Sequence, residues 1–374
     1  MFNFAIRQKA NRLQAPPVSS KRSAHFPGRR TWEKQGKRVS KPQHVATAAW
    51  YYSLVLAVET GMSTKMLTGS FVALITPFNR DGSVDFAAFR TLLKFQEDQG
   101  TSAVLIMGST GETSMLSPEE KKQIIVETGK MKTGHMPIFF GCTGNNTEST
   151  VANVRFAKDN GADGAILAAP AYICAPESDI ERFFLDVADA TDLPLGIYNN
   201  PPRVKSDLHW DHLLRIFKHP NYVVHKESTA RVGQVAQVLA AKPNVSVMCC
   251  DSPNLGLVVP TMSLGGQGTA NMTGNIAPAE LATISTPWTS YVEAENFKGA
   301  YLKLLPLLHF TYSAINPVAV KSLMKVLGLP SGDLRKPLSN LDGEALAKGI
   351  RIVKELGLDK QYGYKVAPIS AVAA

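Results

Sequence analysis

A lysine, Lys226, closes the apolar run YVVHKES at residues 222–228. Burying an ammonium group is costly unless the group is paired or neutralised, so a lysine at the end of a buried strand needs a chemical reason. Desolvation disfavours the charged form, lowers the pKa of the lysine and yields an amine that can attack a carbonyl. The residue therefore predicts Schiff-base chemistry, and the alternative is a side chain that extends from the strand end to solvent.

Two hydroxyl-bearing residues are candidates to assist such a lysine. Tyr198 lies near the end of the apolar run LPLGIYNN at 193–200, and Thr110 lies in the GSTGE turn at 108–112. Forming and dehydrating a carbinolamine requires a proton to move on and off oxygen, and a tyrosine hydroxyl bonded to a threonine hydroxyl is a competent relay. Tyr198 and Thr110 are predicted to be that pair.

Two further features suit carboxylate groups. The GSTGE turn offers backbone N–H groups and the hydroxyls of Ser109 and Thr110 at a strand-to-helix junction, a place that favours anions. A plain glycine-rich turn is the alternative. Arg203 follows Tyr198 by five residues, and its guanidinium fork fits a second carboxylate, against the alternative of an ordinary surface charge.

The sequence gives little sign of a metal or redox centre. No His, Asp or Glu cluster has metal-ligand spacing, which argues against a metal-dependent reaction, and we expect no cofactor. The four cysteines show no C-x-x-C spacing and are expected to be reduced thiols of an intracellular protein. Strand alternation places His225 on the face opposite Lys226, so we expect it to pack against helices.

Eight short apolar runs, separated by amphipathic segments, must position these residues. Continuous apolar strands that alternate with helices indicate parallel strands covered on both faces. Eight units of roughly 25 to 35 residues fit a (β/α)₈ TIM barrel better than an open doubly wound sheet, and active residues then lie at the carboxyl ends of the strands. The runs span residues 70–78, 102–109, 137–144, 164–170, 193–200, 222–228, 245–251 and 266–274.

The two ends of the chain are expected to differ from the barrel. Residues 66–290 are predicted to form the barrel and residues 291–374 an appended C-terminal helical region. The net charge of +9 resides in residues 1–60, which hold eleven basic and two acidic side chains, so the remainder is neutral and shows no sign of a nucleic-acid-binding surface. The apolar stretch at 45–58 is too short to span a membrane.

Residues 1–61 are expected to be a basic, poorly ordered extension outside the chemistry. A basic, acid-poor segment followed by an apolar stretch is typical of an organellar transit peptide. The alternative is an upstream start codon with Met62 or Met66 as the true beginning. We favour this second interpretation, because a strand begins immediately afterwards, and expect a cytoplasmic protein.

The motifs GSTGE, YNNPPR, HKES and GGQGTANMTGN, in this order, closely resemble the pyruvate-dependent class I aldolase family that contains dihydrodipicolinate synthase and N-acetylneuraminate lyase. The resemblance covers about residues 66 to 360. It implies a TIM barrel with a C-terminal helical extension that assembles as a homotetramer or homodimer. It also implies that Lys226 forms an imine with pyruvate or another 2-oxo acid.

Further roles follow from the resemblance alone. Tyr198 becomes the general acid and base, Ser109 and Thr110 the hydroxyl relay and carboxylate site, and Ala270 a backbone contact to the keto acid. Tyr172 matches a tyrosine that a neighbouring subunit adds to the relay. Arg203 matches the arginine that binds the carboxylate of the aldehyde partner in the synthase branch.

The match departs from the synthase branch at four places, and these bear on the second substrate. They are the GST turn, the segment PAYICAPE, the end of the seventh run in MCCDSPN and the altered eighth-run motif. We expect the synthase reaction of pyruvate with aspartate semialdehyde, in lysine biosynthesis. The alternatives are an aldolase or dehydratase of 2-oxo-3-deoxy sugar acids, a hydroxypyrroline-carboxylate deaminase, an N-acetylneuraminate lyase-like enzyme and a non-catalytic barrel that binds a keto acid.

Overall fold

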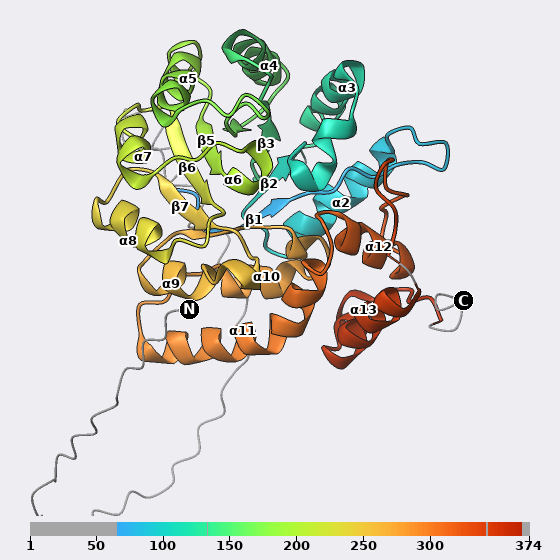
Figure 1. The fold of residues 1–374 in the computed structure, drawn as a ribbon. Coiled ribbons are helices and arrows are strands. Elements are labelled where there is room, and N and C mark those ends of the chain that lie inside the picture. Colours follow the sequence, from blue (N-terminus) through green and yellow to red (C-terminus); the bar gives the residue numbers. More distant parts are fainter. Residues whose placement is uncertain (1–65, 133, 342, 369–374) are drawn as a thin grey trace, which may run out of the picture. The chain divides into compact units, whose positions relative to one another are not determined.

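A closed barrel of eight parallel strands forms the centre of the protein (Figure 1). The computed structural model describes residues 66–132, 134–341 and 343–368. The extension expected over residues 1–61 lies outside the described residues. The strands pair in chain order, and β1 closes the barrel on β8, which confirms the predicted (β/α)₈ architecture. The strands are β1 (Gly69–Ala73), β2 (Ala103–Ile106), β3 (Ile138–Gly141), β4 (Gly164–Leu167), β5 (Leu195–Asn199), β6 (Tyr222–Glu227), β7 (Ser246–Cys249) and β8 (Gly268–Asn271).

Each strand is shorter than the apolar run that predicts it. The run at 70–78 contains β1 only as far as Ala73, yet the residues that follow remain buried. The Ile75 N–H donates to the Asn275 side chain at 3.1 Å, and the Thr76 hydroxyl donates to a loop carbonyl at 2.6 Å. The residues that follow β1 are thus buried although they lie outside the strand. Burial alone therefore does not show where the hydrogen bonding between strands ends.

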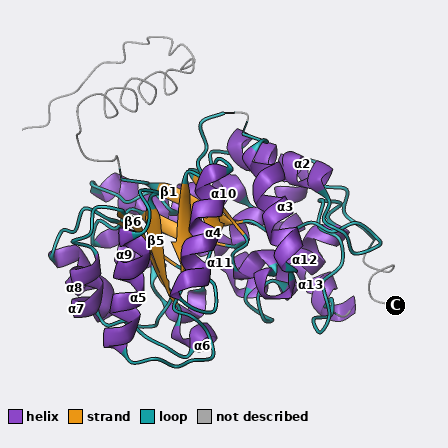
Figure 2. Cartoon of the chain, turned by 90° about the horizontal axis from the view of Figure 1, so that it is seen from above, coloured by secondary structure: helices purple, strands orange, loops and turns teal. Residues whose placement is uncertain are grey.

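Amphipathic helices cover the outside of the barrel (Figure 2). Helix α5, for example, buries Ile180, Phe183, Phe184 and Val187, the spacing of one helical face. The helices are α2 (Phe86–Asp98), α3 (Pro118–Gly129), α4 (Thr147–Asp159), α5 (Glu177–Asp189), α6 (Pro201–Val204), α7 (Trp210–Ile216), α8 (Val232–Ala240), α9 (Val258–Ser263), α10 (Pro278–Ile284), α11 (Tyr291–Thr311), α12 (Val318–Val326), α13 (Gly343–Glu355) and α14 (Leu358–Tyr362). In the described part of the chain, no helix combines the length and apolar character that crossing a membrane requires.

The apolar core has two layers. Side chains that point into the barrel form a small cluster, and those that point outward pack against the helices in a much larger one. This division follows from the two-residue period of a strand, which sends alternate side chains to opposite faces. The inner cluster consists of Phe71, Ala73, Ala103, Leu105, Phe139, Ile166, Val224, Met248 and Ala270.

Candidate active site

Lys226 points into the barrel from the carboxyl end of β6. Val224, two residues earlier, belongs to the inner cluster, whereas the ring of His225 lies 5.4 Å from that of Phe217 at the end of α7. The predicted alternation is therefore correct. The Lys226 side chain is only 6% exposed, and the described residues offer it no carboxylate for an ion pair. A buried amine without an acidic partner is a candidate for reaction rather than for structural support.

Tyr198 is the nearest aromatic neighbour of this lysine. It pairs with Lys226 in the register of β5 and β6, and Lys226 Nζ lies 4.5 Å from the centroid of the Tyr198 ring. The predicted hydrogen bond between Tyr198 and Thr110 is absent. The Tyr198 hydroxyl instead accepts a hydrogen bond from Asn200 Nδ2, and the Thr110 hydroxyl accepts one from Asn316 Nδ2 at 3.0 Å. Each hydroxyl is thus held by an asparagine amide.

The GSTGE turn follows β2 as a short 3₁₀ turn over Ser109–Gly111. Two non-glycine residues with left-handed backbone flank it, Met107 with φ of 58° and Glu112 with φ of 56°. Such conformations cost energy and persist where surrounding contacts enforce them, which is common at functional sites. The N–H groups at the start of the turn have no acceptor within it, so they remain available to an anion.

A fully buried ion pair anchors this turn to the C-terminal region. Glu112 accepts a hydrogen bond from Lys321 Nζ at 2.6 Å and one from the backbone N–H of Arg335 at 2.9 Å. Lys321 also donates to the Thr76 carbonyl at 3.0 Å and lies over the Phe78 ring. Burial lowers the pKa of Lys321, while the Glu112 carboxylate works in the opposite direction. Glu112 therefore holds the turn in place and does not face the substrate.

A cavity of about 570 Å³ opens at the carboxyl ends of the strands, next to these residues. Ser109, Tyr198 and Arg203 line it, as does Lys121 of α3. Of the described residues in its wall, none is acidic, and neither of the two cations has a carboxylate partner among the described residues. A cavity with unpaired cations and no acids favours anionic ligands.

Lys226, Thr110 and Ala270 do not line this cavity directly. Lys226 lies against Tyr198, which does line it, and Thr110 is the buried neighbour of Ser109. Ala270 is buried in the inner cluster with Leu105 and Ile166, which also contribute to the wall. The predicted residues thus gather at one end of the barrel.

Tyr172 is the exception among the predicted residues. It follows β4, and its side chain is 96% exposed. Its backbone is left-handed with φ of 78°, as is that of Cys174 in the same loop. Ala171, directly before it, lines the cavity, whereas Tyr172 itself does not.

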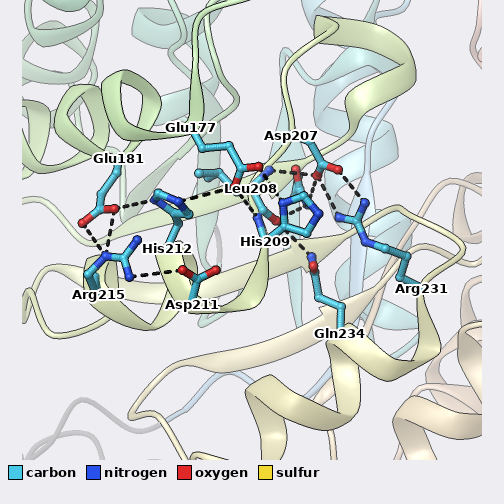
Figure 3. A network of polar contacts seen from close by, with 11 residues as sticks. Glu177, Glu181, Asp207, Leu208, His209, Asp211, His212, Arg215, Arg231 and Gln234 are labelled. Carbon is cyan, nitrogen blue, oxygen red and sulfur yellow. Dashed lines mark hydrogen bonds and ion pairs between the residues drawn. The ribbon is translucent and has the colours of Figure 1, made fainter.

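A polar network supports the strand ends on the Arg203 side (Figure 3). Arg231, directly before α8, forms a two-pronged pair with Asp207, which also accepts a hydrogen bond from Asn199 at the end of β5. Burial acts to raise the pKa of Asp207, but the hydrogen bonds from Arg231 and Asn199 outweigh it and lower the pKa. Gln234 donates to Glu227 at 2.7 Å, directly after Lys226. The network therefore fixes the ends of both β5 and β6.

The structure also shows residues that the sequence alone does not identify. Asn200, Asn316 and Lys321 all contact the candidate site or its supports. Lys321 carries a readable signal, because a lysine inside the apolar helix sequence VAVKSLMKV must find a buried partner. Cys249, in contrast, is fully buried, and burial raises the pKa of its thiol to about 12, which disfavours the reactive thiolate.

Comparisons with known proteins cover the same part of the chain. The model of the dihydrodipicolinate synthetase family matches residues 66–356. A 4-hydroxy-tetrahydrodipicolinate synthase of Gluconacetobacter diazotrophicus is 36% identical over 284 residues, which make up 75% of this chain and 94% of that protein. The enzyme of the same name from Syntrophotalea carbinolica is 34% identical over 296 residues, 78% of this chain and 99% of that protein.

Solved structures agree with these matches. The crystal structure of the chloride-inhibited dihydrodipicolinate synthase from Acinetobacter baumannii, complexed with pyruvate, superposes with a TM-score of 0.72 at 30% identity. The superposition covers 78% of this chain and 99% of that protein. The synthase from Aquifex aeolicus superposes with a TM-score of 0.71 at 30% identity.

Proposed function

The chain belongs to the dihydrodipicolinate synthetase family, and on that premise we propose that it condenses pyruvate with aspartate semialdehyde through an imine on Lys226. It is a class I, Schiff-base-forming, pyruvate-dependent lyase of the dihydrodipicolinate synthase type. One observation supports the assignment of the reactive residue most strongly. Lys226 is buried inside the barrel mouth with no acidic partner among the residues that the structure describes, and its Nζ lies 4.5 Å from the centroid of the Tyr198 ring.

The first step is imine formation. Lys226 Nζ attacks the keto carbon of pyruvate and forms a carbinolamine, which then loses its hydroxyl group as water. The Tyr198 hydroxyl, which lines the cavity, supplies and recovers the proton that this step requires. Asn200 holds the Tyr198 hydroxyl by donating a hydrogen bond to it, which leaves the phenolic hydrogen free for transfer.

The second step joins the two substrates. Loss of a methyl proton converts the imine into an enamine, whose carbon attacks the aldehyde carbon and forms the new carbon–carbon bond. The amino group of the aldehyde partner then attacks the imine carbon, closes the ring and releases Lys226 as a free amine. Every electron pair comes from the two substrates and the lysine, so we propose that no cofactor takes part.

The charges of the cavity support carboxylate substrates. Ser109 is placed to receive the carboxylate of pyruvate, with the N–H groups of its turn. Arg203 of α6 is exposed in the cavity wall and carries a guanidinium that can bind the carboxylate of the aldehyde partner in two-pronged fashion. The backbone of Ala270 on β8 remains the proposed contact to the keto acid.

We further propose that the protein acts in the cytoplasm as a homotetramer or homodimer. The exposed Tyr172 supports an assembly, because a phenol that does not line the cavity of its own barrel is free to reach the site of a neighbouring copy. Its hydroxyl would extend the relay that begins at Tyr198 in that neighbour.

A substrate panel tests the proposed reaction. Purified protein is mixed with ¹³C-labelled pyruvate and aspartate semialdehyde, and the product is followed by NMR. We expect a cyclised product that requires both substrates. Turnover of a 2-oxo-3-deoxy sugar acid or of sialic acid, without the cyclised product, would assign the chain to another branch.

A further inference from the structure

Asn316, in the segment between α11 and α12, contacts both hydroxyls of the predicted carboxylate site. Its Nδ2 lies 3.0 Å from Thr110 Oγ1 and 3.5 Å from Ser109 Oγ. The residue also lines the cavity. Its Oδ1 is buried, and it is the one such side-chain atom of the described cavity wall without a hydrogen-bond partner.

The direction of these hydrogen bonds determines what the hydroxyls can do. A hydroxyl group has one hydrogen and two lone pairs. Because the Asn316 amide donates, it occupies a lone pair and leaves the hydrogen of each hydroxyl free. No described atom accepts a hydrogen bond from Ser109 Oγ or from Thr110 Oγ1. The hydroxyl of Ser109, which lines the cavity, can therefore donate to an anion there, and the hydroxyl of Thr110, buried next to it, also keeps its hydrogen free.

We propose that Asn316 is a positioning residue for the 2-oxo acid, because it holds Thr110 and keeps the hydroxyl hydrogen of the neighbouring Ser109 free for the carboxylate of that substrate. This inference rests on the proposed function, which supplies the carboxylate. The unpaired Oδ1 points the same way, since buried acceptors without a partner are rare and mark places where a ligand or water completes the hydrogen bonding.

Two substitutions separate positioning from packing. Asn316→Asp keeps the shape of the side chain, but its carboxylate accepts hydrogen bonds, takes up the hydroxyl hydrogens and adds a negative charge beside the substrate. Asn316→Ala removes the contact and leaves room for a water that can donate in its place. If Asn316 positions the hydroxyls, the isosteric Asp variant is worse than the truncated Ala variant. If Asn316 only packs against the loop, the truncated Ala variant is worse than the isosteric Asp variant.

The readout is the KM for pyruvate against the KM for the aldehyde, with kcat and the melting temperature measured in parallel. We expect Asn316→Asp to raise the KM for pyruvate by about tenfold or more and Asn316→Ala by less, with little change in the KM for the aldehyde. Asn160→Asp is the matched control. The Asn160 side-chain amide also donates a hydrogen bond, but to the carbonyl of Phe156 at 2.8 Å, at the end of α4 and outside the cavity.

Borohydride trapping of the wild-type protein with pyruvate keeps the two proposals distinguishable. If wild-type protein traps no pyruvate, the proposed function fails. If it does, three results would overturn the role of Asn316: a KM for pyruvate within twofold of wild type in the Asp variant, a larger effect of Ala than of Asp, or an equal rise in both KM values. Should the Asp variant fold poorly, the Ala variant alone decides, since a KM for pyruvate unchanged within twofold contradicts positioning.

Discussion

Tyr198 has two contacts that belong to different parts of its side chain. The ring lies over Lys226 Nζ, whereas the hydroxyl is held by Asn200 and lines the cavity. A substitution that removes the hydroxyl and keeps the ring therefore separates packing from proton transfer. Removing the Tyr198 hydroxyl should therefore slow the reaction without destabilising the fold.

Tyr198→Phe is expected to lower kcat by about 10²- to 10⁴-fold, the usual contribution of a general acid and base. The melting temperature should change little, because the ring still packs against Lys226. Steady-state kinetics and thermal unfolding are measured on the same preparation. A kcat within threefold of wild type would assign the proton transfer to another group.

The sequence predicts residues at strand ends and misses those that contact the site from far along the chain. Lys226 and Tyr198 could be identified because each is a polar residue at the end of an apolar run, and the carboxyl ends of barrel strands are where active-site residues lie. Asn316 contacts Thr110 across 206 positions in the chain, in a segment with no strand pattern to place it. For the same reason the sequence does not identify the two asparagines that hold the hydroxyls of Tyr198 and Thr110, and the relay between these two residues stays a prediction.

At the scale of elements, α12 and the turn after β2 are joined by the ion pair of Lys321 and Glu112. Both side chains are fully buried. Removing one partner of such a pair leaves a buried charge without compensation, which is far more costly than removing both. The turn also carries Ser109 and Thr110, so its anchor affects the site as well as stability.

Lys321→Met is expected to destabilise the fold by about 3 to 5 kcal/mol, because Glu112 is left charged and buried. The double variant Glu112→Gln with Lys321→Met should recover most of this loss, since the amide can still accept the Arg335 N–H. Denaturant unfolding of both single variants and the double variant completes the cycle. Additive losses in the double variant would contradict a coupled pair.

The contact of the C-terminal segment with α3 predicts a dependence on pH. Hydrogen bonding to the Arg335 guanidinium lowers the pKa of Glu120 below its usual range. A carboxylate whose pKa is lower in the folded state stabilises the fold above its unfolded pKa of about 4.3, and this contribution is lost as the pH falls through the folded pKa. Glu227, buried after Lys226, has a lowered pKa as well: burial acts to raise it, but hydrogen bonds led by that from His225 prevail.

The melting temperature should therefore change little from pH 7 to about pH 5 and fall below about pH 4.3, where these carboxylates take up protons. Glu120→Gln should reduce the steepness of that fall, because one carboxylate no longer titrates. Its exposed neighbour Glu119 has no partner among the described residues, and Glu119→Gln is the control. An acid transition that Glu120→Gln leaves unchanged would show that the Arg335 pair contributes nothing.

For the whole molecule, the barrel and the C-terminal helical region share the candidate site. Asn316, Lys321 and Arg335 all contact the turn after β2. We propose that residues 291–374 complete the site, in addition to any role in assembly. The repeat of apolar runs is enough to predict the barrel, because eight strands leave few topologies. These cross-contacts have no periodic signal and become visible only in the folded chain.

Assembly is tested by mixing subunits. The Lys226→Ala variant lacks the amine but keeps the Tyr172 hydroxyl. The Tyr172→Phe variant keeps the amine but lacks that hydroxyl. If Tyr172 serves a neighbouring copy, hybrids contain some sites with both intact groups, and activity exceeds that of either variant alone. The variants are mixed, dissociated and reassembled, and sedimentation confirms the assembly. Activity equal to the average of the two parents would place Tyr172 outside the neighbour's site.

The most direct test of the account is covalent trapping of the imine. Wild-type protein is incubated with pyruvate and borohydride, digested and mapped by mass spectrometry, with Lys226→Ala and Lys205→Ala as parallel samples. Lys205 is an exposed lysine beside the same site and serves as the control. We predict one reduced pyruvate adduct, on the peptide that contains Lys226, in the wild-type and Lys205→Ala proteins and none in Lys226→Ala. An adduct that persists in Lys226→Ala, or its absence from the wild type, would contradict the central claim.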